Sequence, residues 1–259
     1  MMKRSVRKGL RVIAGLACMV CVMALGVMFA QGRVHDQTYD ELEEAFDREV
    51  SQGSDASDRE DDVEDAEEED ADPYEGHATL PPTVLGWLSV GNTSISYPVV
   101  QSTESMPHDW YLDHDAWDRW NPLGCPYLDD RAVAGGQHMV IYAHHNEGTN
   151  QMFSELARMY HQAAFETLGD LTWETAEGTV TYKPMCAMRV DSSYSTIQTF
   201  SFTDDEAFRH WLDWIAISCD AQSPTGDEDR DVATQACTLI TCSNAEAGQQ
   251  ERTLVVFVR

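Results

Sequence analysis

The hydrophobic positions of the chain follow three different patterns in three successive segments. Residues 12–31 form an apolar run without a charge, residues 51–77 are almost wholly polar, and beyond them apolar residues recur in short runs. Gly, Asn, Pro and Asp separate these short runs, which is typical of strands joined by turns. The chain therefore divides into an N-terminal segment 1–35, a linking segment 36–78 and a folded domain 79–259.

The folded domain is expected to be mainly β, with a few helices. Residues 84–90 and 94–101 predict two strands, and the Gly91-Asn92 dipeptide between them favours a hairpin turn. Six further strands are predicted at 125–128, 139–143, 171–174, 179–190, 236–241 and 253–258. About eight short strands in one domain indicate a closed or nearly closed eight-stranded β-barrel.

Helical spacing of apolar residues appears in three places. Residues 36–50 predict a short amphipathic helix, and residues 151–160 predict another. Residues 204–218 give the strongest pattern, because four large apolar side chains share one face and Thr203 can cap the first turn. These four are Phe208, Trp211, Leu212 and Ile215.

The N-terminal segment predicts a membrane helix. Five Lys and Arg residues between positions 3 and 11 precede the apolar run, and a run of roughly 18 or more apolar residues is long enough to cross a bilayer. The basic flank is expected in the cytoplasm, so the chain would pass the membrane once with residues 36–259 outside. A cleaved signal peptide is the alternative, but residues 27–30 offer no clear small-x-small cleavage site.

Charge is concentrated in the linking segment. The net charge is −28, and residues 36–75 hold 20 acidic residues against Arg48 and Arg59. Such a segment cannot bury enough apolar surface to offset chain entropy, so residues 51–77 predict a disordered stalk. Residues 76–259 are also acidic, which argues against nucleic acid as a partner.

Seven cysteines bear on the compartment and the chemistry. Cys18 and Cys21 lie in the apolar run, and five others would be extracytoplasmic, where disulfides persist. Five is an odd number, so at least one thiol is unpaired within a monomer. If that thiol is Cys242, the remaining four allow three pairings, and all four could equally be reduced. They are Cys125, Cys186, Cys219 and Cys237.

Three residues at predicted strand ends could act together. Cys242 ends one apolar strand, His144 follows another, and Arg252 precedes the last. Each alone is more often structural. Together they supply a nucleophile, a positive neighbour that favours its thiolate, and a group that stabilises an oxyanion.

The motifs around these residues resemble those of sortases, a family of cysteine transpeptidases. The sequence T-L-I-T-C ending at Cys242 resembles the sortase signature T-L-x-T-C. The sequence I-Y-A-H-H-N ending at Asn146, with M-F at 152–153, resembles the family's I-Y-G-H segment and its downstream M-F. Arg252 follows the cysteine by ten residues and precedes an apolar strand, as the sortase arginine does.

Other segments resemble class B sortases in particular. Residues 86–101 resemble the two opening strands of the family, and Y-L-D-H-D at 111–115 resembles the class B stretch Y-L-x-H-D. The helix predicted before the cysteine strand also favours class B. His108 and His114, which lie among several aspartates, are therefore interpreted as scaffold rather than as a metal site. The resemblance covers about residues 83–259.

The resemblance implies a role for each matched residue. Cys242 would be the nucleophile, His144 the general acid and base, and Arg252 the group that positions substrate and stabilises the oxyanion. His144 is preferred to His145 because it directly follows the Y-A pair. Thr241 would help to orient the substrate carbonyl.

Two positions depart from the family pattern. Ala143 replaces the usual Gly, which restricts the backbone there. Ser243 follows the nucleophile where several class B members have an acid, so no acidic residue is assigned a catalytic role.

The resemblance also implies an activity and partners. The enzyme would cleave a C-terminal sorting signal of secreted proteins, of Asn-Pro-x-Thr type, through a thioacyl intermediate. It would join the new end to an amine of a cell-wall precursor or a pilin lysine, with no cofactor and no metal. A cysteine peptidase or amidase, and an inactive anchored binding or assembly factor, are the alternatives.

Overall fold

The computed structural model describes part of the chain, namely residues 39–40, 42–51, 80–244 and 250–259. Residues 39–40 and 42–51 are helical, in the region where a helix is predicted over 36–50. The predicted membrane segment and the acidic stalk lie outside the described residues. Among the helices that are described, none has the length and apolar character needed to span a bilayer.

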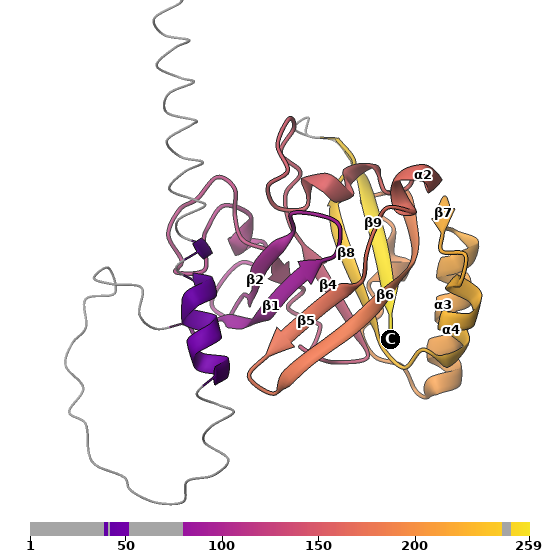
Figure 1. The fold of residues 1–259 in the computed structure, drawn as a ribbon, viewed down its shortest axis with the longest axis horizontal. Coiled ribbons are helices and arrows are strands. Elements are labelled where there is room, and N and C mark those ends of the chain that lie inside the picture. The colour runs from indigo at the N-terminus through magenta and orange to yellow at the C-terminus, as the bar shows by residue number, and fades with distance from the viewer. Residues whose placement is uncertain (1–38, 41, 52–79, 245–249) are drawn as a thin grey trace, which may run out of the picture. The chain divides into compact units, whose positions relative to one another are not determined.

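Eight strands close into a barrel (Figure 1). Their order round the ring is β5-β1-β2-β3-β4-β8-β9-β6, and β6 pairs back onto β5. A short ninth strand, β7, pairs antiparallel with β6 at Cys186 and Ala187. The strands are β1 (Val84–Val90), β2 (Ser96–Gln101), β3 (Tyr127–Leu128), β4 (His138–Tyr142), β5 (Leu171–Thr175), β6 (Gly178–Asp191), β7 (Ala221–Gln222), β8 (Ala236–Cys242) and β9 (Glu251–Val258).

The predicted closed eight-stranded barrel is confirmed. Each predicted strand is present, with ends that differ by two residues or fewer. Short apolar runs bounded by turn residues located them, because the strands of the barrel wall are largely buried.

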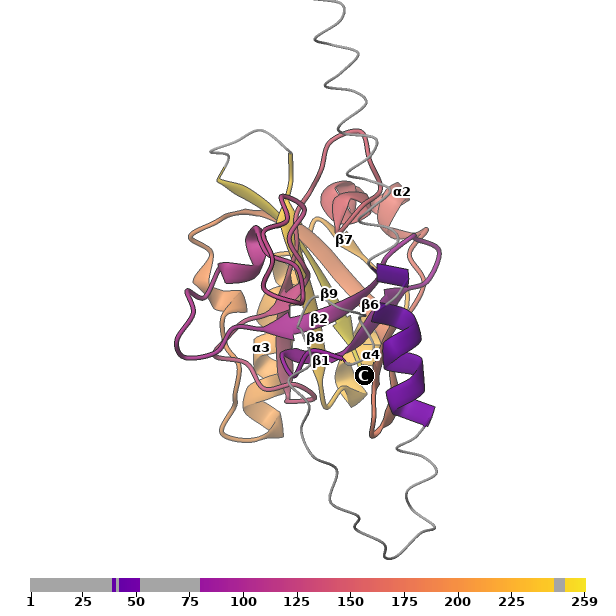
Figure 2. The same cartoon turned by 90° about the vertical axis from the view of Figure 1, so that its left-hand side faces the viewer.

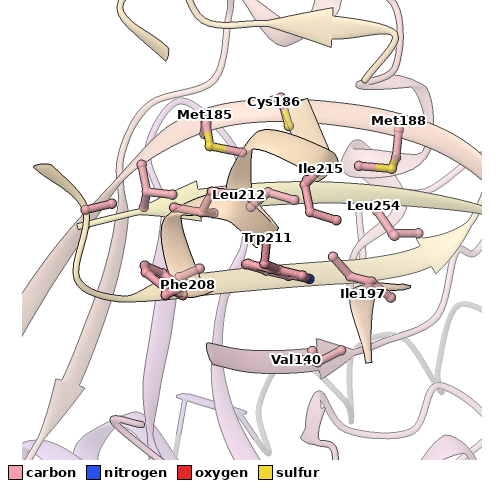
Figure 3. Packing of buried hydrophobic residues seen from close by; sticks show 14 of the residues in the cluster. Val140, Met185, Cys186, Met188, Ile197, Phe208, Trp211, Leu212, Ile215 and Leu254 are labelled. Carbon is pink, nitrogen blue, oxygen red and sulfur yellow. The ribbon is translucent and has the colours of Figure 1, made fainter. Parts of the chain in front are cut away.

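Helices α3 (Asp205–Ile217) and α4 (Gly226–Val232) lie outside the ring of strands (Figures 1 and 2). Helix α3 packs an apolar face on the sheet. Its buried side chains Phe208, Trp211 and Leu212 belong to one hydrophobic cluster, which also holds Met185, Met188 and Leu254 of β6 and β9 (Figure 3). Thr203 was expected to cap this helix, but the side chain of Asp204 does so by accepting a hydrogen bond from the Ala207 N–H at 2.8 Å.

The helix predicted over 151–160 is broken into shorter pieces. Met152 is fully buried with a φ of 54°, a left-handed conformation that interrupts a right-handed helix. The chain then continues as a single 3₁₀ turn, η3 (Ser154–Arg158), followed by α2 (Gln162–Phe165). Two further 3₁₀ turns are η2 (Trp110–Leu112) and η4 (Ser195–Ile197).

A disulfide bond joins Cys186 of β6 to Cys219, which follows the end of α3. Their Cα atoms are 6.0 Å apart. The bond therefore fastens the end of α3 to the barrel wall. Cys125 and Cys237 are reduced and buried, so the described domain holds one disulfide, which is neither one of the three complete pairings of the four cysteines nor the fully reduced state.

Candidate active site

The three predicted catalytic residues meet at one edge of the barrel because of the strand register. Strand β8 lies between β4 and β9. It is parallel to β4 with Tyr142 opposite Ile240, so His144 and Cys242 emerge at the same level. It is antiparallel to β9 with Cys242 opposite Arg252. Directly opposed residues of antiparallel strands have Cβ atoms about 5 Å apart.

All three residues line one pocket of about 750 Å³. The apolar part of its wall comes from Leu112, Val190, Ile197, Ile240 and Leu254. The long loop between β2 and β3 forms one part of the wall, and the connection between β6 and α3 forms another. A pocket with an apolar wall and a few convergent polar groups is typical of a ligand-binding or active site.

Cys242 differs from the other free cysteines. It is half-buried and lines the pocket, whereas Cys125 and Cys237 are buried. Burial raises the pKa of the Cys237 thiol well above its usual range, so this thiol stays protonated and unreactive. Among the described free cysteines, Cys242 is therefore the one that a substrate in the pocket could reach.

His144 is held by its ring and by its backbone. Nε2 lies 2.6 Å from the Leu112 carbonyl oxygen, and because a carbonyl only accepts, Nε2 carries a hydrogen in this arrangement. The His144 carbonyl accepts a hydrogen bond from the Phe153 N–H at 3.0 Å. Met152 and Phe153, the M-F pair, are both fully buried and anchor the loop that carries the histidine.

Arg252 brings a positive charge to the pocket from the start of β9. Its Nη1 donates to the Glu251 carbonyl at 3.1 Å. Its guanidinium carries several N–H donors and a fixed positive charge, so it can stabilise an oxyanion beside Cys242.

Thr241 is buried, although it borders the pocket. Its hydroxyl donates to the Ala143 carbonyl at 2.9 Å and so ties β8 to the end of β4. The hydrogen of this hydroxyl is therefore already used inside the protein. A contact between Thr241 and the substrate carbonyl stays a prediction.

The two departures from the family pattern have simple structural accounts. Ala143 does not appear among the described residues with positive φ, so its methyl group causes no backbone strain. Ser243 lies beside β9, where its Oγ is 3.1 Å from Oγ1 of Thr253.

The two histidines interpreted as scaffold, His108 and His114, have different surroundings. The His114 ring stacks on Trp110 with centroids 3.6 Å apart, and its Nδ1 is 2.9 Å from the Trp110 carbonyl oxygen. His108 lines the pocket wall. Within the described residues no group of three or more potential ligands could hold a metal ion.

Sequence reasoning missed a polar cluster that also lines the pocket. The Arg131 guanidinium donates to both oxygens of the buried Asp129 carboxylate, at 2.8 and 2.7 Å. The Tyr142 hydroxyl donates to the same carboxylate at 3.1 Å. Burial alone would raise the pKa of Asp129, but the hydrogen bonds from Arg131 reverse this and hold it below its usual value. The spacing D-x-R directly after a strand was the available signal.

Comparison with known proteins agrees with this geometry. No family model matches the chain. Sortase B of Staphylococcus aureus (strain NCTC 8325 / PS 47) is 26% identical over 174 residues, which is 67% of this chain and 68% of that protein.

Solved structures of the same kind share the fold. A Staphylococcus aureus sortase B–substrate complex is 19% identical with a TM-score of 0.65, covering 88% of this chain and 97% of that one. Clostridium perfringens sortase B is 20% identical with a TM-score of 0.60, covering 69% of this chain and 94% of that one.

The barrel, the pocket and these similarities are those of a sortase-type cysteine transpeptidase. In sequence and in fold alike, the similarity is to sortase B proteins.

Proposed function

We propose that this protein is a class B sortase that is anchored in the cell membrane and acts outside it on secreted proteins that carry a C-terminal sorting signal. Cys242, His144 and Arg252 are its catalytic residues. The observation that carries the proposal is the register of β4, β8 and β9, which brings these three to one pocket.

The reaction has two steps. In the first, the Cys242 thiolate attacks the backbone carbonyl carbon of a Thr in the signal, and Arg252 stabilises the resulting oxyanion. The C–N bond breaks, His144 gives a proton to the leaving amine, and a thioester joins the substrate to Cys242. In the second, an amine attacks the thioester, gives up a proton to His144, and releases the Cys242 thiolate.

Two solved relatives suggest the ligand classes. One Staphylococcus aureus sortase B structure is a complex with substrate, and another sortase B structure is a complex with triglycine. For this chain we propose an Asn-Pro-x-Thr-type signal as donor, and an amine of a cell-wall precursor or of a pilin lysine as acceptor.

The proposed location has its own support. The apolar run 12–31 with its basic flank predicts a retained anchor with the N-terminus in the cytoplasm. The Cys186–Cys219 disulfide favours an oxidising compartment for the barrel. Protease added to intact cells should digest the barrel and spare the N-terminal tail, and protection of the barrel would contradict this location.

Cys242→Ala tests the proposed chemistry. The variant should form no thioacyl adduct with a signal peptide, because it lacks the nucleophile, and intact-protein mass spectrometry measures that adduct. Cys125→Ser is the matched control, since its thiol is buried and its hydroxyl can still donate to the Pro98 carbonyl as the thiol does. Adduct formation by Cys242→Ala would refute the assignment.

Product analysis with and without an added amine tests the reaction type. A transpeptidase should transfer the peptide to triglycine or to a lysine-containing peptide. Hydrolysis that is unaffected by any amine would instead indicate a cysteine peptidase or amidase.

A further inference from the structure

Three contacts join the ends of β4 and β8 beside the nucleophile. The Ala143 N–H donates to the Ile240 carbonyl at 3.2 Å, and the Thr241 hydroxyl donates to the Ala143 carbonyl at 2.9 Å. The third involves a residue that the proposed reaction does not use, because Nδ1 of His145 lies 3.1 Å from the Cys242 carbonyl oxygen.

The ring of His145 takes the role of a backbone donor. In a pair of parallel strands, every second residue of one strand forms two hydrogen bonds to the other strand. Its N–H donates to the carbonyl of the residue before its partner, and its carbonyl accepts from the N–H of the residue after its partner. Ala143 bonds in this way to Ile240, so the next donor would be the N–H of residue 145 and the next acceptor the Cys242 carbonyl. Strand β4 ends at Tyr142, and the His145 ring supplies the hydrogen bond instead.

The peptide unit between Cys242 and Ser243 is thereby held from both sides. Its N–H, from Ser243, donates to the Glu251 carbonyl of β9 at 3.1 Å. Its carbonyl, from Cys242, accepts from His145, and because a carbonyl only accepts, Nδ1 of His145 carries a hydrogen. These two bonds fix the rotation of the peptide that follows the nucleophile.

His145 is itself firmly placed. Its backbone forms an isolated β-bridge with Met152, whose N–H donates to the Tyr97 hydroxyl at 3.0 Å. The next residue, Asn146, donates its N–H to Ser154 Oγ at 2.8 Å. Among the described residues that line the pocket, His144 is present and His145 is not, so the substrate is expected to meet the first ring and not the second.

We propose that His145 is a positioning residue, whose Nδ1–H holds the Cys242 peptide so that the thiol faces the pocket. This inference rests on the proposed role of Cys242. Without the donor, the Cys242 carbonyl loses its partner and the peptide can rotate. A misplacement of about 1 Å at a reacting atom can cost about 100-fold in rate.

Variants at position 145 distinguish the effect of losing the hydrogen-bond donor from the effect of losing side-chain volume. His145→Ala removes the ring, His145→Leu restores volume without a donor, and His145→Asn places an amide N–H close to where Nδ1 lies. The two variants without a donor should lose about 10- to 100-fold in kcat with KM within about twofold, because substrate binding is untouched. His145→Asn should recover to within about threefold of the wild type. His161→Ala, which changes an exposed histidine outside the pocket, should behave as the wild type.

Each outcome has a distinct meaning. Wild-type kcat in His145→Leu, or an equal loss in His145→Asn, would overturn the inference. Thermal midpoints measured in parallel show whether a variant is folded, and if His145→Ala unfolds, the comparison of Leu with Asn still decides. Wild-type protein that forms no Cys242-dependent thioacyl adduct would instead refute the proposed function.

Discussion

His138 is a fully buried histidine that the protein holds in its neutral form. Its Nδ1 donates to the Thr199 carbonyl at 2.7 Å, and its Nε2 accepts from the Thr238 hydroxyl at 2.8 Å. Burial lowers the pKa of His138 to about 4. The ring therefore links β4 and β8 to the segment after η4, which forms part of the pocket wall.

This residue predicts a pH dependence of stability. The folded pKa lies below the unfolded value of about 6.5, so the unfolded chain binds the proton more readily. The stabilising effect is complete above the unfolded pKa and is lost as pH falls toward the folded pKa. From pH 7 to pH 5 the loss should be about 2 kcal/mol.

Urea unfolding at several pH values measures this effect. His138→Gln cannot titrate in this range, so its free energy of unfolding should fall less between pH 7 and pH 5 than that of the wild type. Equal declines in the two proteins would show that His138 does not cause the dependence.

Residue patterns predicted one part of the site and not another. The convergence of Cys242, His144 and Arg252 could be predicted because each stands at the end of a strand. The ends of strands can be located from the apolar runs in the sequence. The contact of His145 with the Cys242 carbonyl could not be predicted, because it depends on the path of the loop around Met152. The pairing of Cys186 with Cys219 depends on how α3 docks, which spacing along the chain does not encode.

At the scale of elements, α3 shows how local signals and packing agree. Its apolar face is buried against β6 and β9, and its first turn holds Asp205 and Glu206, whose charge suits the positive end of the helix dipole. Asp204 completes this start by accepting from the Ala207 N–H.

Asp204→Ala tests the capping bond. Removing the acceptor should lower the free energy of unfolding by about 1 kcal/mol, within a usual range of roughly 0.5–2. Asp204→Asn retains a capping oxygen and should stay close to the wild type. Chemical denaturation measures both, and an equal loss in the two variants would mean that charge rather than capping is responsible.

The elements missed by sequence reasoning lack an apolar pattern. Helix α4 reads G-D-E-D-R-D-V and has almost no apolar face, so it gave no helical periodicity. It is held by ion pairs instead, including Arg230 with Asp213 of α3 at 2.9 Å. Strand β7 has only two residues, which is too short to show alternation.

At the scale of the whole domain, the disulfide closes a long segment that forms one wall of the pocket. Cys186 and Cys219 are 33 residues apart, and the chain between them contributes Val190, Tyr194 and Ile197 to the pocket. The bond therefore restrains one wall of the pocket, although this segment lies far from Cys242 in the sequence.

The double variant Cys186→Ser, Cys219→Ser tests this restraint. A loop of this size should contribute about 4 kcal/mol by restricting the unfolded chain, so the melting temperature should fall clearly. KM for the signal peptide should rise because the wall is less fixed. Cys125→Ser is the control, and a variant with unchanged melting temperature and KM would contradict the role of the bond.

The state of the five cysteines in the described domain determines how many of them a thiol reagent can label. In the described domain two cysteines are bonded to each other, two are buried, and Cys242 alone opens to the pocket. A maleimide probe applied to the native domain should therefore label Cys242 alone, without prior substitution of the other cysteines. The Cys242 thiol can be counted and titrated in the presence of the other cysteines, so a ligand that occupies the pocket can be detected directly as protection of a single thiol.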